Sequence, residues 1–101
     1  MDRDPLISPD VLARYAGDAA REVSGVSALA ESPRHRGRSV EIEESDGAVA
    51  VEVHVDLEWG RSGAEVGRAI QRRVREYVER MTRKSVGTVE VVIERVTPPP
   101  V

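Results

Sequence analysis

Residues 45–58 read Ser-Asp-Gly-Ala-Val-Ala-Val-Glu-Val-His-Val-Asp-Leu-Glu, a turn signal followed by a segment in which every second side chain is Val or Leu and those between them are Ala or polar. Asp-Gly is a strong signal for a two-residue β-hairpin turn, and strict alternation indicates a strand with one buried face. We therefore expect a hairpin whose second strand covers 48–58. Its buried side consists of Val49, Val51, Val53, Val55 and Leu57.

The turn also fixes which residues of the hairpin lie opposite each other. A first strand near 39–44 then places Ile42 opposite Val51 on the apolar side and Glu41 opposite Glu52 on the polar side. Facing like charges destabilise a sheet, so the polar side is expected to be an acidic patch, either simply solvated or used to bind a partner. We name it the acidic sheet face, and its members are Glu41, Glu43, Glu52, His54, Asp56 and Glu58.

A helix is predicted before the hairpin. Ser8-Pro9-Asp10 combines a capping side chain, a proline suited to the first helical position and an acid near the positive end of the helix. Gly25 is a plausible terminator. An apolar stripe recurs at helical spacing and is formed by Leu12, Tyr15, Ala16, Ala19 and Val23. Residues 30–39 then read as a polar loop.

A second helix is predicted over 63–83, after the Gly60–Gly63 turn, and a last strand near 87–96. Trp59, at the end of the hairpin, is expected to cover the core, and Gln71 is expected to bond a backbone group. The apolar stripe of this helix is Val66, Ile70, Val74, Tyr77, Val78 and Met81. We name its opposite side the basic helix side, and its members are Arg68, Arg72, Arg75 and Arg83.

The predicted element order is α-β-β-α-β, and each strand has one apolar face. Two helices with one stripe each can cover that face, so we expect an α+β fold, a two-layer sandwich with both helices on one face of a three-stranded mixed sheet. The pattern does not decide which hairpin strand the last strand joins. One domain is expected over 8–96, between a lead-in at 1–7 and a Pro-rich tail at 97–101.

Composition narrows the function classes. The 101 residues include no Cys, which excludes disulfides and thiolate chemistry, and the net charge of −3 argues mildly against nucleic acid as the main partner. No segment has the roughly 18 apolar residues of a membrane span. The first residues lack a signal-peptide pattern, so a cytoplasmic location is expected.

Several short motifs along the chain together resemble the alkaline shock protein family of bacterial envelope stress proteins. They are Ile7-Ser8, Gly25-Val26, Trp59-Gly60, the set Val66, Gln71 and Val74, then Met81-Thr82 and Val89-Glu90-Val91 leading to Val96. The similarity spans roughly residues 7–96. The sequence departs from the family pattern at Arg83, where glycine is frequent, and at Glu90, where asparagine is common.

The resemblance implies a small non-enzymatic cytoplasmic protein of Gram-positive-type bacteria that acts in cell-envelope homeostasis and needs no cofactor. It implies protein partners, including further copies of the chain and a membrane-anchored protein that holds some members at the inner face of the membrane. The order α-β-β-α-β with oppositely charged faces suggests head-to-tail self-association, which can build rings or filaments.

The chain offers no catalytic or metal motif in its spacing. An open sheet face is not the cleft that a catalytic carboxylate pair requires. Glu52, His54 and Asp56 lie about 6.6 Å apart along a strand, too far for these strand-mates alone to surround a metal ion, although Glu41 could contribute. We therefore expect no resident metal.

The alternative function is nucleic-acid binding. Gly60-Arg61-Ser62-Gly63 fits the G-x-x-G loop with which KH domains clamp a nucleic-acid backbone. In those domains the loop joins two helices, whereas here it is predicted to follow a strand. A strand-to-helix turn that uses glycine for backbone freedom is the favoured interpretation.

Overall fold

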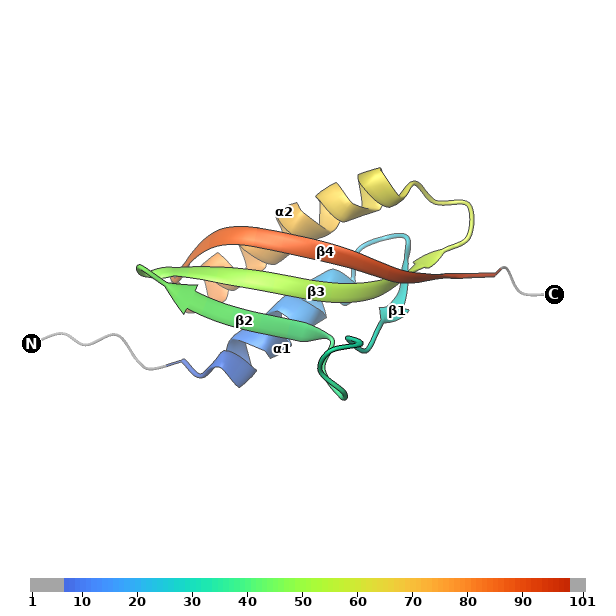
Figure 1. Ribbon diagram of the computed structural model, residues 1–101. Helices are drawn as coiled ribbons and strands as arrows, with labels where there is room; N and C mark the ends of the chain where they lie inside the picture. Colours follow the sequence, from blue (N-terminus) through green and yellow to red (C-terminus); the bar gives the residue numbers. More distant parts are fainter. Residues whose placement is uncertain (1–6, 99–101) are drawn as a thin grey trace, which may run out of the picture.

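A computed structural model describes residues 7–98 of the chain (Figure 1). Two helices and four strands follow one another as α1 (Pro9–Arg21), β1 (Val26–Leu29), β2 (Val40–Ser45), β3 (Ala48–Glu58), α2 (Gly63–Thr82) and β4 (Ser85–Thr97). Residues 1–6 of the lead-in expected at 1–7, and residues 99–101 of the tail expected at 97–101, lie outside the described residues.

The hairpin has the register that its turn predicts. Ile42 pairs with Val51 and Glu41 with Glu52 between the antiparallel strands β2 and β3. Asp46 and Gly47 have φ angles of 54° and 77°, the positive values that a type I′ turn requires at both central positions. The prediction of this element is confirmed.

The sheet has four strands rather than the predicted three. β3 lies at its centre, with β1 and β2 pairing antiparallel along one edge and β4 pairing parallel along the other, so the sheet is mixed. The last strand thus joins the second strand of the hairpin. The missed strand β1 has only four residues, too few for a readable alternation, and is held by pairs such as Leu29 with Val55.

Both helices lie behind the sheet in Figure 1, and the core forms between these elements. Ser8 caps α1 as predicted, because its hydroxyl oxygen accepts the Val11 N–H at 3.2 Å. Tyr15 of α1 and Tyr77 of α2 meet edge to face with ring centroids 5.8 Å apart. The fully buried helix residues include Leu12, Ala16, Ile70, Val74 and Val78.

Two residues expected in or over the core are exposed instead. Met81 lies in the last turn of α2 with its side chain exposed. Trp59 follows β3 and is 66% exposed, so it does not cover the core. Its backbone N–H donates to the Thr97 carbonyl at 3.1 Å, which fixes the chain at the end of the sheet while the indole remains in solvent.

Side chains of α2 bond to the backbone of β4 near its start. Arg75 Nη1 donates to the Val86 carbonyl at 2.6 Å, and Glu79 Oε2 accepts the Val86 N–H at 2.9 Å. Gln71 Nε2 donates to the Val89 carbonyl at 3.1 Å, as the sequence predicts for this residue. These bonds satisfy backbone groups on the outer side of β4, where no other strand within residues 7–98 pairs.

Candidate functional site

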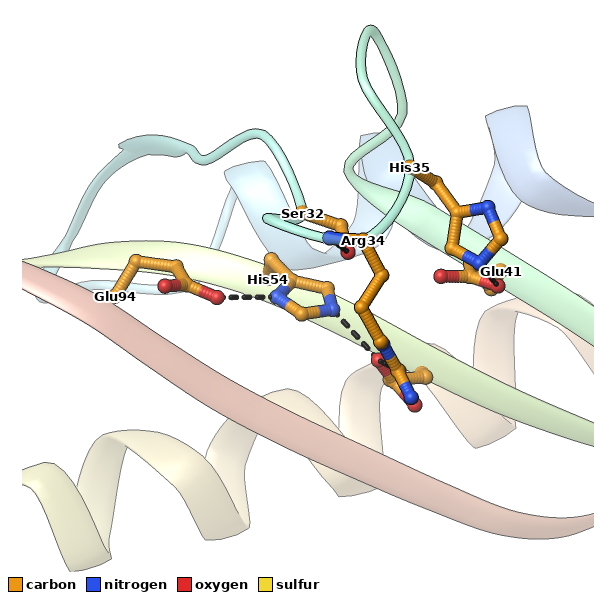
Figure 2. A network of polar contacts seen from close by, with 7 residues as sticks. Ser32, Arg34, His35, Glu41, His54 and Glu94 are labelled. Atoms are coloured by element: carbon orange, nitrogen blue, oxygen red, sulfur yellow. Dashed lines mark hydrogen bonds and ion pairs between the residues drawn. The ribbon is translucent and has the colours of Figure 1, made fainter.

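The loop between β1 and β2 folds over the face of the sheet that the helices leave free (Figure 2). Both ends of the loop bond to the backbone of His54. The Ala30 N–H donates to the His54 carbonyl at 2.9 Å, and the His54 N–H donates to the Ser39 carbonyl at 2.8 Å. Within the loop, the Ser32 N–H donates to the Arg38 carbonyl at 2.7 Å. The loop therefore covers part of a face that alternation alone predicts to be exposed.

His54 lies at the centre of a polar network under this loop, and the residue is only 3% exposed. Its Nδ1 is 2.6 Å from Oε2 of Glu94 on β4, and its Nε2 is 2.7 Å from Oε2 of Glu52 on β3. Arg34 Nη2 donates to the same Glu52 oxygen at 2.7 Å. Figure 2 shows the His54 imidazole with its hydrogen bond to Glu94.

The network changes the acidity of its members. Burial by itself lowers the pKa of His54, but hydrogen bonds to Glu94 and Glu52 and the charges of these carboxylates outweigh it, so the pKa is raised above 6.5. The hydrogen bond from His54 is the main cause that lowers the pKa of Glu52, and Arg34 adds to it. The arrangement favours an imidazolium between two carboxylates.

Glu41 lies next to this network, on β2 opposite Glu52. Its Oε1 is 3.2 Å from Nε2 of His35 in the loop, and its Oε2 is buried without a hydrogen-bond partner among the described residues. One oxygen each from Glu41 and Glu52 and a nitrogen of His54 lie within 4.8 Å of one another. A hollow of about 470 Å³, lined in part by Arg34, His35, Glu41, Glu52 and Glu90, opens this cluster to solvent.

The acidic sheet face is therefore divided. Glu43 and Glu58 are exposed, Glu41 and Glu52 are half-buried, and His54 and Asp56 are buried. The expectation that all alternate residues of β3 on this side face solvent is wrong for His54 and Asp56, because the loop covers the first and the Arg95 guanidinium lies against the second at 3.4 Å.

The basic helix side is also divided. Arg68 and Arg72 are exposed on α2. Arg75 bonds the backbone of β4, so its guanidinium has a structural role. Arg83 is the C-terminal cap of α2, with a φ of 60° in the left-handed region where glycine is usual.

The Gly60–Gly63 segment joins β3 to α2, as predicted for a strand-to-helix turn. Ser62 is the N-cap of α2, since its hydroxyl oxygen accepts the Glu65 N–H at 3.2 Å. Arg61 donates to the Ser24 hydroxyl at 3.1 Å and to the Glu58 carboxylate at 3.4 Å. The residues that would clamp a nucleic-acid backbone in a KH domain are thus used here within the fold.

Sequence reasoning missed three side chains that contact polar residues of β3. Arg34, Glu94 and Arg95 contact β3 from positions 18 to 40 residues away along the chain. Nothing in the position of Arg34 along the sequence predicts its contact with Glu52. The contact of Glu94 with His54 depends on the parallel pairing of β3 and β4, which the sequence leaves open.

Residues 4–98 match the alkaline shock protein 23 family, which is described as having a cell envelope-related function. No curated protein sequence matches the chain. Within residues 7–98, neither helix is long and apolar enough to cross a membrane.

Similar solved structures include a nickel form of a MamM CTD variant, which is 13% identical with a TM-score of 0.57 and matches 85% of this chain and 96% of that chain. A manganese form of another MamM CTD variant is 12% identical with a TM-score of 0.56, over 85% of this chain and 96% of that chain. At this level of identity the likeness shows the fold alone.

Proposed function

We propose that this chain, which belongs to the alkaline shock protein 23 family with its cell envelope-related function, is a non-enzymatic interaction module. In this proposal the acidic sheet face of one copy binds the basic helix side of the next. Assemblies formed in this way would be held at the inner face of the cell membrane by a membrane-anchored protein partner.

The observation that supports the proposal is that two exposed carboxylates beside the hollow and two exposed arginines of α2 lie on opposite sides of the domain. Glu43 of β2 and Glu90 of β4 are exposed beside the hollow on the helix-free face. Arg68 and Arg72 are exposed on α2, which lies behind the sheet (Figure 1). No carboxylate of residues 7–98 forms an ion pair with either arginine.

A contact between two different faces is heterologous. Each copy that joins through one face therefore leaves its other face free to bind a further copy. Such a contact generates a ring if the rotation closes and a filament if it does not. Complementary charge also steers the encounter of the two surfaces and penalises wrong orientations. A small domain with this charge distribution can therefore form a scaffold without any catalytic group.

Salt controls this association if the proposal is correct. The screening length falls from about 30 Å at 0.01 M salt to about 3 Å at 1 M. We expect sedimentation velocity across a concentration series to show assemblies at the low salt concentration and the monomer at the high one. A monomer under both conditions, at every concentration, would refute self-assembly and leave only binding to a different protein.

A further inference from the structure

Three potential metal ligands converge on the helix-free face of the sheet, at the cluster beneath the loop. The hairpin register places Glu41 directly opposite Glu52, and His54 follows two residues later on the same side of β3. One ligand atom from each lies within 4.8 Å of the other two. Atoms at this separation can surround a single cation with small side-chain rotations, because metal–ligand bonds are about 2.0–2.2 Å long.

His54 is oriented as a metal-binding histidine usually is. Oε2 of Glu94 lies 2.6 Å from Nδ1, so the other ring nitrogen, Nε2, faces the carboxylate of Glu52. In protein metal sites, the nitrogen that does not bind the metal normally donates its hydrogen to such a carboxylate, which fixes the ring and strengthens the ligand. Glu94 comes from β4, so this support is independent of the hairpin that brings the ligands together.

Glu41 provides a second observation that points to a cation. Its Oε2 atom is buried and has no hydrogen-bond donor within residues 7–98. Buried carboxylate oxygens are normally bonded, because an unsatisfied one is costly. A cation between Glu41 and Glu52 would satisfy this oxygen and offset the repulsion of the two facing carboxylates.

We propose that Glu41, Glu52 and His54 form a binding site for a divalent transition-metal ion such as Zn²⁺. One imidazole and two carboxylates suit zinc and its neighbours, whereas Mg²⁺ and Ca²⁺ prefer oxygen ligands alone. His35, with Nε2 at 3.2 Å from Glu41 Oε1, is placed to become a fourth ligand. Arg34 lies on the solvent side of Glu52 with a largely exposed side chain, so it can move aside as the ion enters through the hollow.

The composition of the chain makes the proposal easy to test. His35 and His54 are its only histidines and Cys is absent, so nitrogen coordination of a metal reports on this cluster. The full chain, without an affinity tag, is titrated with zinc chloride by calorimetry. In parallel, Co²⁺ is added and its visible absorption is recorded. We expect saturable binding of one ion per chain and cobalt bands typical of nitrogen and oxygen ligands.

Two substitutions and a control distinguish the loss of a metal ligand or its support from the mere loss of a negative charge. Glu41→Gln removes a proposed ligand and should weaken Zn²⁺ binding at least about tenfold. Glu94→Gln touches only the far side of His54 and should weaken binding about 10- to 100-fold, the range for supporting residues of this kind. Glu43→Gln is the matched control, because it removes the same charge from an exposed position two residues further along β2, and binding should change less than about threefold.

The proposal fails if the unsubstituted chain shows no saturable binding below millimolar Zn²⁺. It also fails if Glu41→Gln and Glu94→Gln bind Zn²⁺ as Glu43→Gln does. Circular dichroism verifies that each variant is folded. Neither test requires assembly, so failure of the proposed scaffold function would not by itself remove Zn²⁺ binding.

Discussion

His54 connects the central strand to its surroundings through both ring nitrogens. Glu52 and Glu94 bond these nitrogens, Arg34 faces the same cluster from the loop, and the ring is buried. A buried imidazolium is tolerated only with such partners. The stability of the fold should therefore depend on the protonation of this one side chain.

The raised pKa of His54 fixes the direction of that dependence. Its stabilising contribution is complete below the unfolded pKa, about 6.5, and is lost as the pH rises through the folded pKa. We expect the free energy of unfolding, measured with urea in the presence of a chelator, to fall as the pH rises above about 6.5. The variant His54→Gln should lose this slope, whereas His35→Gln, which removes an exposed histidine, should keep it. An unchanged slope in His54→Gln would contradict the assignment.

Single residues differ in how far the sequence predicts them. Glu41 and Glu52 follow from the turn, because one dipeptide sets the register of the whole hairpin. The burial of His54 does not follow, because it depends on where a loop of irregular structure folds. Trp59 shows the limit of residue type as a guide, since an aromatic at a strand end fits a core position and a solvent position equally well.

At the scale of elements, α2 both covers the core and protects the edge of β4. The apolar stripe of α2 is buried. The side chains of Gln71, Arg75 and Glu79 bond to the backbone of Val86 and Val89, on the edge strand β4. Arginines that look equivalent in the sequence consequently have different roles. Arg75 stabilises the fold, and Arg72 is available to a partner.

Alanine substitutions separate these two roles. Arg75→Ala should lower the free energy of unfolding by about 1.5–3 kcal/mol, because it removes a charged hydrogen bond to a part-buried carbonyl. Arg72→Ala should change it by less than about 0.5 kcal/mol, as is usual for an exposed side chain. Urea denaturation of the two variants measures both values. A similar loss in both would mean that the bond to Val86 adds nothing to stability.

Most elements could be predicted from their patterns, and the exceptions have physical reasons. Both helices and the hairpin carry caps, stripes or a turn that act over a few residues. β1 carries none of these signals and exists because β3 offers it a free edge. The position of β4 likewise depends on pairing between distant segments, which local patterns do not determine.

On the scale of the whole molecule, the covering loop reduces the part of the acidic sheet face that remains exposed to solvent. Part of the acidic sheet face is used internally, where Arg34, His54 and Arg95 offset its carboxylates. Glu43 and Glu90 remain exposed on that side, and Arg68 and Arg72 remain exposed on α2. The fold could be read from the sequence in outline, whereas the residues that remain exposed on each face required the structure.

The most direct test of the scaffold proposal reverses each face separately and then mixes the variants. One variant carries Arg68→Glu with Arg72→Glu, and the other carries Glu43→Arg with Glu90→Arg. Each should sediment as a monomer at low salt, because like charges then meet at the contact, and an equimolar mixture should assemble as the unsubstituted chain does. Assembly of either variant alone, or a mixture that stays monomeric while the unsubstituted chain assembles, would contradict the head-to-tail contact.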